Sequence, residues 1–531
     1  MVSDDLAEGQ ERRVGRVVAV SAAQATVLLN RQDIAALEMG NLVKMRTRLG
    51  TAYAMVSRLE VAGPTLEPSH GDLQMAEIEF AGEIGEGDSA PFQRGLSAYP
   101  ALDDPVWLAA PTDLQKIYAR PEVASAPIGS IHQDAAIPAY ILTDELFSKN
   151  FSIIGSTGSG KSCLVAAILA AVLDYAPNAH IVLLDPHGEY ANAFGSRAEV
   201  LSPEDGLYFP YWLFNLDELT EIVLGAERQP DQAKILAEAV LAAKQSYFEK
   251  TGLDRRGTVD TPVPYRIADV LYSVDAVMGS LNPPESIAAY RAVIARITAL
   301  QNDARYGFVF GSRMTLRDEL CDILAQLFRI PAAGRPITIL HLAGIPSEAV
   351  NVIVSVLCRL AFDFALWSTT PIPITIICEE AHRYAPRDKS LGFEGAKRAL
   401  FRIAKEGRKY GVSLCVVSQR PSDLALGLLS ECSTMFAFRM TDQEDQIIVR
   451  SAAPESCSGL LNFLPALRTA ETIAVGEGVS LPIRIRLTPL TAERRPKSAT
   501  AAFTEAGQTE IDGGRIEQTV ERWRWGFHQL G

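Results

Sequence analysis

The N-terminal part of the chain, to about residue 110, alternates short β-rich apolar runs with polar breaks. Gly, Asn and Asp stand in these breaks, where they favour turns. Short strands at this close spacing are typical of a small barrel or sandwich. The predicted strands are Val14–Val20, Ala25–Leu29, Leu42–Thr47, Tyr53–Leu59 and Leu73–Ile84.

From about Ile141 the pattern changes to near-continuous apolar runs that alternate with longer helical stretches. Strands that are apolar on both faces belong to a parallel sheet covered by helices on both sides. We therefore expect an α/β core. Its predicted strands are Phe151–Ile154, Ile181–Leu184, Ile337–Leu342, Ile374–Cys378 and Leu414–Val417.

Between about residues 215 and 330 the pattern becomes helical, most clearly at Asp231–Lys250 and Pro284–Leu300, which indicates a helical insertion in the sheet domain. The chain ends in the helix-compatible segment Arg515–Gln529, which carries Trp523 and Trp525 and is either a docked tail or a solvated end. The predicted segments are an N-terminal barrel (1–115), the first part of the core (116–214), the helical insertion (215–335), the second part of the core (336–490) and a C-terminal brace or tail (491–531).

Composition limits the classes of function. The 531 residues exceed what one hydrophobic core usually serves, so two or three structural units are expected. The 50 Lys and Arg against 64 Asp and Glu give a formal net charge of −14. This charge argues against a protein whose whole surface coats nucleic acid, so any DNA contact is expected to be local, as in a pore. An acidic enzyme that touches no DNA is the alternative.

The chain begins MVSDDLAEGQERR, which is acidic and polar where a secretory signal has a basic start and an apolar run. The apolar run Leu164–Leu173 is shorter than the roughly 20 residues of a membrane-spanning helix, so we expect a buried helix, no membrane contact and a cytoplasmic protein. The cysteines lack the spacing of a zinc site or a disulfide framework and are expected to be buried small hydrophobes. They are Cys163, Cys321, Cys358, Cys378, Cys415, Cys432 and Cys457.

The segment Gly155–Ser162 reads Gly-Ser-Thr-Gly-Ser-Gly-Lys-Ser between a predicted strand and the helical Cys163–Tyr175. This strand–loop–helix context is what a phosphate-binding loop requires, and it disfavours a chance match in a Gly-rich turn. Lys161 is expected to reach the β and γ phosphates of ATP, and the Ser162 hydroxyl to bind Mg²⁺. The predicted nucleotide-binding residues are Gly155, Ser156, Thr157, Gly158, Ser159, Gly160, Lys161, Ser162 and Cys163.

Acidic and polar residues follow three other predicted strands. Glu379 is expected to hold Mg²⁺ through water, and Glu380 to act as the general base on the attacking water. Asp185 either tunes that water or the metal, or forms a turn with the Pro that follows it. Gln419 is the candidate sensor of the γ-phosphate. Because parallel strands place their carboxyl ends at one edge of a sheet, these side chains are predicted to serve one hydrolytic site with the phosphate loop.

A helix-compatible cationic segment lies between the acid pair and the sensor strand. Such a segment is normally a solvated face, but in an oligomeric motor an arginine from the adjacent subunit stabilises the γ-phosphate charge. We expect Arg408 to be that arginine, with Arg402 second, and the remaining cations to face a pore and meet DNA phosphates. The cations are Lys397, Arg398, Arg402, Lys405, Arg408 and Lys409.

Together these motifs resemble the HerA branch of the HerA–FtsK family of hexameric motors, over about residues 10 to 490. One departure is that many relatives carry Asp where this chain has Glu379; a carboxylate remains, so the predicted roles are kept. The stretches that carry the resemblance are His132-Gln-Asp-Ala-Ala-Ile-Pro-Ala, Asp185-Pro-His-Gly-Glu-Tyr, Glu379-Glu-Ala-His-Arg-Tyr, and Glu406-Gly-Arg-Lys-Tyr-Gly continuing into Ser418-Gln-Arg-Pro.

The resemblance implies an α/β, RecA-like P-loop NTPase core of the ASCE class with a HAS-type N-terminal barrel. It also implies a homo-hexamer that hydrolyses ATP between subunits and moves along double-stranded DNA in a central pore. HerA-like proteins work with a nuclease or a sirtuin-like effector in DNA end processing or anti-phage defence, so a separate effector is expected to dock on the barrel. Three functions stay open: a DNA translocase or helicase, an ATPase ring used mainly as a scaffold, and a machine that remodels protein.

Overall fold

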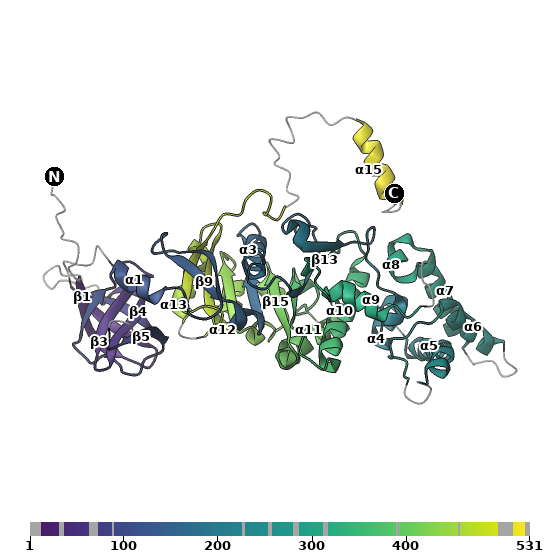
Figure 1. Cartoon of the computed structure of the whole chain (residues 1–531), viewed down its shortest axis with the longest axis horizontal. Helices are drawn as coiled ribbons and strands as arrows, with labels where there is room; N and C mark the ends of the chain where they lie inside the picture. The colour runs from purple at the N-terminus through teal and green to yellow at the C-terminus, as the bar shows by residue number, and fades with distance from the viewer. Residues whose placement is uncertain are drawn as a thin grey trace. The chain divides into compact units, whose positions relative to one another are not determined.

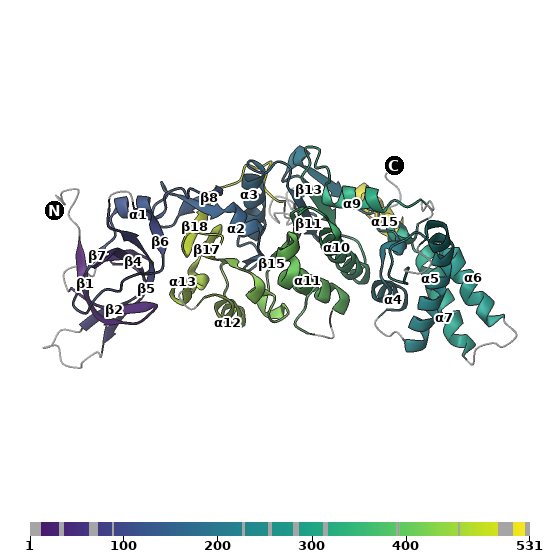
Figure 2. The same ribbon diagram turned by 60° about the horizontal axis from the view of Figure 1, so that its bottom comes forward.

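The computed structural model of the chain divides into two compact units. The first unit comprises Met1–Val172, Gln419–Ser422 and Cys432–Pro489, and the second comprises Leu173–Ser418, Asp423–Glu431 and Leu490–Gly531. Figures 1 and 2 show their elements in two views. The residues that the structure describes are 12–30, 37–62, 73–87, 90–225, 229–252, 257–279, 286–311, 317–388, 391, 393–454, 457–497 and 513–525.

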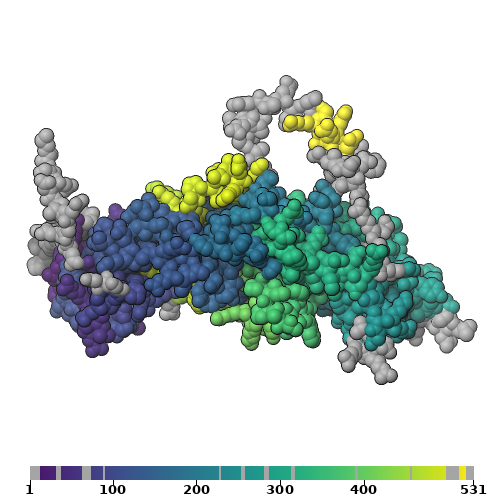
Figure 3. All heavy atoms as spheres, in the orientation of Figure 1, coloured from purple at the N-terminus to yellow at the C-terminus, as the bar shows by residue number. Residues whose placement is uncertain are grey.

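The N-terminal strands form a closed barrel, coloured purple in Figures 1 and 3. The strands lie in the order β2-β1-β7-β3-β4-β5-β6, and pairing of β2 with β5 closes a barrel of six, with β6 beside β5. Alternate side chains such as Val17, Met45 and Val56 fill its interior without exposure. The predicted small barrel is therefore confirmed. The strands are β1 (Arg13–Val20), β2 (Gln24–Leu29), β3 (Leu42–Thr47), β4 (Gly50–Ala62), β5 (Leu73–Gly85), β6 (Phe92–Arg94) and β7 (Pro105–Leu108).

The rest of the first unit is built on six strands in the order β10-β16-β17-β18-β8-β9. Only β10 and β16 run parallel; each later pair is antiparallel. This antiparallel part was not predicted. The elements are β8 (Ser125–Ile131), β9 (Pro138–Leu142), β10 (Phe151–Ile154), β16 (Thr434–Phe438), β17 (Glu471–Gly476) and β18 (Ile483–Leu487), with α1 (Pro111–Ile117), α2 (Thr143–Phe147), α3 (Lys161–Leu173), α12 (Gln443–Ala452), α13 (Ser458–Leu461) and η10 (Leu464–Ala466).

The second unit contains five parallel strands in the order β12-β13-β11-β14-β15. The central strands are buried on both faces, as their continuous apolar runs predict. The strands are β11 (His180–Asp185), β12 (Ala198–Leu201), β13 (Ile337–His341), β14 (Ile374–Cys378) and β15 (Val412–Ser418). The short helices are η2 (Gly195–Arg197), η3 (Tyr211–Leu213), η4 (Ala304–Tyr306), η5 (Ala381–Arg383), η6 (Gly407–Tyr410) and η8 (Leu429–Glu431), and η7 (Pro421–Asp423) joins the two units in sequence.

Helices make up the remainder of the second unit. The predicted helices Asp231–Lys250 and Pro284–Leu300 correspond to α5 and α7, so the helical insertion is confirmed. The boundaries of the five predicted segments remain predictions, and the predicted C-terminal helix lies partly outside the described residues. The helices are α4 (Leu216–Leu224), α5 (Pro230–Thr251), α6 (Ile267–Met278), α7 (Ile287–Asn302), α8 (Gly307–Phe310), α9 (Leu320–Phe328), α10 (Ser347–Trp367), α11 (Glu394–Glu406) and α15 (Gly513–Trp525).

Among the described helices, α10 alone is long and apolar enough to cross a membrane by length and composition. In its most apolar window 67% of the helix is buried inside the protein. It packs against α4, α11 and β15 of its own unit. Its apolar character is therefore that of a core helix in an α/β unit.

The cysteines only partly follow the expectation of burial, although all of them are free thiols. Cys321 is exposed near the start of α9, whose buried side is formed by Ile323, Leu327 and Phe328. The prediction is thus wrong for Cys321, because that helix buries a different face, and it is only partly met at Cys163 and Cys432, which are half-buried. The buried cysteines are Cys358, Cys378, Cys415 and Cys457.

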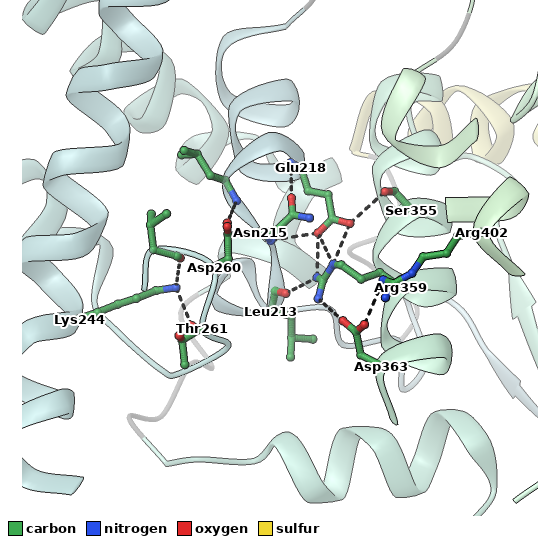
Figure 4. Close-up of polar contacts among 12 residues, drawn as sticks. Leu213, Asn215, Glu218, Lys244, Asp260, Thr261, Ser355, Arg359, Asp363 and Arg402 are labelled. Carbon is green, nitrogen blue, oxygen red and sulfur yellow. Dashed lines mark hydrogen bonds and ion pairs between the residues drawn. The ribbon is translucent and has the colours of Figure 1, made fainter. Parts of the chain in front are cut away.

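A buried ion pair joins α4 of the helical insertion to α10 (Figure 4). The Arg359 Nη2 donates to the Glu218 Oε2 at 2.8 Å and to the Leu213 carbonyl at 2.7 Å. Ser355 Oγ donates to the other Glu218 oxygen at 2.9 Å, and Asn215 N–H closes a capping box on the same carboxylate. The Glu218 side chain is 2% exposed and that of Arg359 15%, so this carboxylate depends on protein donors.

Arg359→Met is expected to lower the free energy of unfolding of the second unit by about 3 kcal/mol or more, because it leaves a buried carboxylate without its cation. Urea unfolding followed by circular dichroism measures the loss. Arg335→Met is the matched control: Arg335 pairs with Glu199 but is 53% exposed, so a loss below about 1 kcal/mol is expected. Equal losses in the two variants would contradict the role of burial.

A buried lysine stabilises the loop after α5, as Figure 4 also shows. Lys244 Nζ donates to the carbonyls of Val259 and Thr261 at 2.6 and 2.8 Å and lies 5.3 Å from the Tyr265 ring centroid. Burial lowers the pKa of Lys244 to about 8, although Asp260 opposes that shift. The loop backbone at these residues is neither helix nor strand. The lysine therefore supplies hydrogen-bond donors to carbonyls that no regular structure satisfies.

Candidate active site

The predicted phosphate loop lies between a buried strand and a helix of the first unit, as its sequence context requires. β10 leads into the loop, and α3 begins at Lys161. Gly155, Gly158 and Gly160 have positive φ angles of 152°, 73° and 121°. A Cβ on Gly155 would lie 2.5 Å from the Cβ of Phe438, so no side chain fits there. The loop therefore presents bare backbone at a helix N-terminus, an arrangement that binds phosphate.

Hydrogen bonds within the loop hold this shape. The Lys161 Nζ donates to the carbonyls of Gly155 and Ser156 at 2.9 and 3.1 Å, and its residue is 8% exposed. Ser159 Oγ donates to the Ser156 carbonyl at 2.7 Å. The ammonium group thus lies against the loop itself, and phosphate oxygens would replace these carbonyls when ATP binds. The predicted ligand Ser162 is half-buried in the first turn of α3.

The candidate sensor lies directly beside the phosphate loop. Thr157 Oγ1 donates a short hydrogen bond to the Gln419 Oε1, and both residues belong to the first unit. The loop is also fixed to the end of β16, since Ser156 N–H and Oγ both donate to the Arg439 carbonyl, at 3.0 and 2.8 Å. The structure therefore brings Gln419 to the loop, as predicted; its sensing of the γ-phosphate remains a prediction.

The acid pair follows β14, which lies between β11 and β15 in the second unit. Glu379 and Glu380 are only 7% and 8% exposed. Glu380 has φ 51° and ψ 45°, a left-handed conformation that is unusual for a residue with a side chain. Strained backbone of this kind occurs preferentially at functional sites, so the observation supports a special role for Glu380.

Asp185 organises the loop after β11. Its carboxylate accepts hydrogen bonds from the backbone N–H groups of His187, Glu189 and Tyr190 at 3.3, 3.1 and 3.0 Å. The Tyr190 hydroxyl in turn donates a short hydrogen bond to the Glu379 Oε1. Asp185 thus has the turn-forming role that the sequence left open, and through this loop it positions Tyr190 on the predicted metal ligand. Its participation in metal or water chemistry remains a prediction.

Two histidines flank the predicted general base. His382 Nδ1 lies 3.3 Å from the Glu380 Oε2 and 3.1 Å from the Ser418 Oγ. His187 Nε2 lies 4.0 Å from the Glu380 Oε1. Glu380 Oε2 is buried and makes no hydrogen bond within the protein. A buried carboxylate oxygen with a free lone pair is suited to accept a proton from water. In the sequence, Tyr190, His187 and His382 stand only within motifs and gave no signal of these roles, because their contacts join different strands.

The cationic segment forms α11 and η6, and its arginines differ in their partners. The Arg402 guanidinium lies 3.9 Å from the Phe362 ring centroid and donates to Asp363 at 3.2 Å. Arg398 donates to Asp217 at 2.9 Å. Arg408 is exposed on η6, and within the described part of the chain no ion pair engages it. The geometry therefore favours Arg408 over Arg402 as a residue that reaches another subunit, a role that stays a prediction for both.

The residues present fit the predicted ATP and Mg²⁺. Among the described residues no group of three or more His, Cys, Asp or Glu side chains forms a metal cage. Mg²⁺ does not need one, because in nucleotide sites it is held by one or two protein oxygens together with phosphates and water. Ser162 of the first unit and Glu379 of the second remain the predicted protein ligands. When bound, the ion would neutralise phosphate charge during transfer.

The loop between strand and helix, with acids at the ends of neighbouring parallel strands, defines a P-loop ATPase. The fold agrees: a solved structure of VirB4 from Thermoanaerobacter pseudethanolicus superposes with a TM-score of 0.50 at 14% identity, covering 71% of this chain and 99% of that one. The family profile described as "Helicase HerA, central domain" matches residues 126–361.

Curated relatives extend the similarity beyond that domain. The DNA double-strand break repair helicase HerA of Pyrococcus furiosus is 24% identical over 503 residues, covering 85% of this chain and 82% of the relative. The protein of the same description from Saccharolobus solfataricus is 23% identical over 502 residues, covering 89% and 92%. The chain is similar over most of its length to the HerA helicases, as the sequence motifs indicated, and it is an ATP-hydrolysing enzyme.

Proposed function

We propose that this chain is the subunit of a homo-hexameric ring that moves along double-stranded DNA in its central pore and works with a separate nuclease or sirtuin-like effector. The effector would dock on the N-terminal barrel, and the complex would act in the cytoplasm in DNA end processing or anti-phage defence. The main support is the ATPase machinery together with the similarity to relatives named DNA double-strand break repair helicases. The match covers most of this chain and most of each relative.

In this proposal the phosphate loop and the acid pair serve one hydrolytic site, as their motifs predict. Lys161 exchanges its loop carbonyls for phosphate oxygens, and Glu379, oriented by Tyr190, holds Mg²⁺. Glu380 takes the proton of the attacking water on its buried, unbonded oxygen. Gln419 registers the γ-phosphate through the loop that it touches. Arg408, exposed on η6, stabilises the transferred charge in the neighbouring subunit.

A test is the effect of duplex DNA ends on ATP turnover at low salt. We expect a rise in turnover with the wild-type chain and no turnover, with or without DNA, for Lys161→Ala. Strand movement should be lost together with turnover. An ATPase rate that blunt duplex leaves unchanged at low salt would exclude translocation as the main function.

The scaffold function is the second candidate, and one observation favours it. Two cations expected to face DNA, Lys397 and Arg398, are paired with Glu394 and Asp217 of their own chain. An ATPase ring that mainly assembles an effector needs no pore of free cations. In that case a chain that binds ATP without hydrolysing it should still activate the effector.

A further inference from the structure

Three arginines lie near one buried carboxylate, Glu471, in the first unit. The same unit carries the phosphate loop. The register pairs Glu471, at the start of β17, with Arg486 near the end of β18. Glu471 also lies beside the end of β16, which runs parallel to β10. Arg468 precedes β17, and Arg484 is two residues before Arg486 on the same face of β18. We call Arg468, Arg484 and Arg486 the arginine cluster.

The arginine cluster is joined to the phosphate loop by backbone hydrogen bonds. Ala470 N–H donates to the Ser159 carbonyl at 2.9 Å, and Leu487 N–H donates to the Ala470 carbonyl at 2.9 Å. Ala470 has a positive φ of 62°, and a Cβ on Gly160 would lie 3.3 Å from the Ala470 Cα. The segment that carries the cluster is therefore in contact with the loop that binds nucleotide.

The cluster carries more positive charge than its carboxylate neutralises. Arg484 Nη2 donates to the Glu471 Oε2 at 2.7 Å, and the Arg468 N–H bonds the same oxygen at 3.1 Å. Arg486 reaches no closer than 3.6 Å to the Glu471 Oε1, and His132 Nδ1 is also 3.6 Å from that atom. Glu471 is one carboxylate against the guanidinium groups of Arg484 and Arg486, and Arg468 adds a third positive charge near enough to act on His132.

The direction of the pKa shift of His132 indicates that the local electrostatic potential is positive. Burial lowers the pKa of His132, and Arg484, Arg486 and Arg468 lower it further, although Glu471 acts in the opposite direction. The imidazole is therefore neutral at neutral pH and adds a hydrogen-bonding group without adding charge. One donor of the cluster, Arg484 Nε, is buried without a hydrogen-bond partner. An oxygen of an anionic ligand would satisfy it.

We propose that the arginine cluster is a second phosphate-binding site, next to the phosphate loop and distinct from it. Guanidinium groups bind phosphate through two parallel N–H donors, and Arg486 is 53% exposed and only loosely held by Glu471. The ligand is a phosphate group of a nucleotide or of the DNA backbone. The DNA source rests on the proposed function, whereas the nucleotide source rests only on the ATPase site.

Charge reversal at Arg486 tests the site and separates the two sources. If the phosphate belongs to a nucleotide, Arg486→Glu should raise the Kd for a fluorescent ATP analogue at least about 10-fold and leave DNA binding unchanged. If it belongs to DNA, the affinity for a blunt 30-bp duplex should fall, and the slope of log K against log salt should decrease by about 1 per lost contact. Fluorescence anisotropy over a salt series gives both quantities.

Arg335→Glu is the matched control, because Arg335 is equally exposed, pairs with one carboxylate, Glu199, and lies just before β13, at the amino-terminal edge of its parallel strands. Values for Arg486→Glu that equal those of Arg335→Glu in both assays would overturn the proposal. If Arg486→Glu does not fold, Arg468→Gln decides alone, since only the backbone of Arg468 bonds Glu471; unchanged ATP affinity and salt slope would then overturn it. Failure of the wild-type chain to bind duplex counts against the proposed function and leaves the nucleotide assay decisive.

Discussion

Glu380→Gln is expected to lower ATP turnover by at least about 100-fold while ATP still binds, because the amide cannot accept the proton of the attacking water. Glu380 has the geometry of a base: it is 8% exposed, has a left-handed backbone conformation and keeps one buried oxygen without a hydrogen bond. Gln preserves the size of the side chain, so the phosphate loop and its hydrogen bonds should be unaffected. Turnover and the Kd for a fluorescent ATP analogue are the two measurements.

Glu238→Gln on α5 is the matched control, since the Glu238 side chain is 65% exposed and pairs only at 3.9 Å with Lys234. This variant should keep both ATP turnover and ATP affinity. If Glu380→Gln kept turnover within about threefold of the wild type, the base would have to be another group. The same variant separates the two candidate functions, because a scaffold should retain effector activation and a translocase should lose strand movement.

The sequence predicted local features well where a short pattern determines them. The spacing of Gly155, Gly160 and Lys161 identified the loop. The pattern is reliable because the folded loop requires glycine: a Cβ on Gly155 would collide with Phe438. The continuous apolar run of β14 identified a central strand because both of its faces are covered. The antiparallel strand β18 was not predicted. It is only five residues long, and every second residue is polar, so it lacks the continuous apolar run that identified the other strands of the core.

The roles of individual site residues depended on contacts that no pattern contains. Asp185 was left between two roles, and three backbone N–H groups from its own loop gave it the turn-forming one. Tyr190 had no role until the fold placed its hydroxyl on Glu379, which follows 189 residues later in the chain. Arg402 contacts Phe362 and Asp363, which both lie on α10. Helical spacing within α11 alone therefore does not indicate that this arginine has partners in its own chain.

Arg408→Ala is expected to lower ATP turnover at least about 1000-fold if Arg408 acts on the neighbouring subunit's nucleotide. Its side chain is exposed on η6, and the described structure gives it no ion pair whose loss would affect stability. Arg402→Ala is the matched control. It removes the contact with the Phe362 ring and the pair with Asp363, so it should lower the melting temperature and change turnover only a few-fold.

Mixed rings determine whether the arginine acts between subunits. A subunit with Arg408→Ala keeps Glu380, and a subunit with Glu380→Gln keeps Arg408, so each inactive chain supplies what the other lacks. Random assembly at equal amounts should make about a quarter of the interfaces complete, and turnover should rise from near zero toward that fraction. Subunit exchange is verified by mass. Rings that are mixed but stay inactive at every ratio would show that Arg408 acts within its own subunit or not at all.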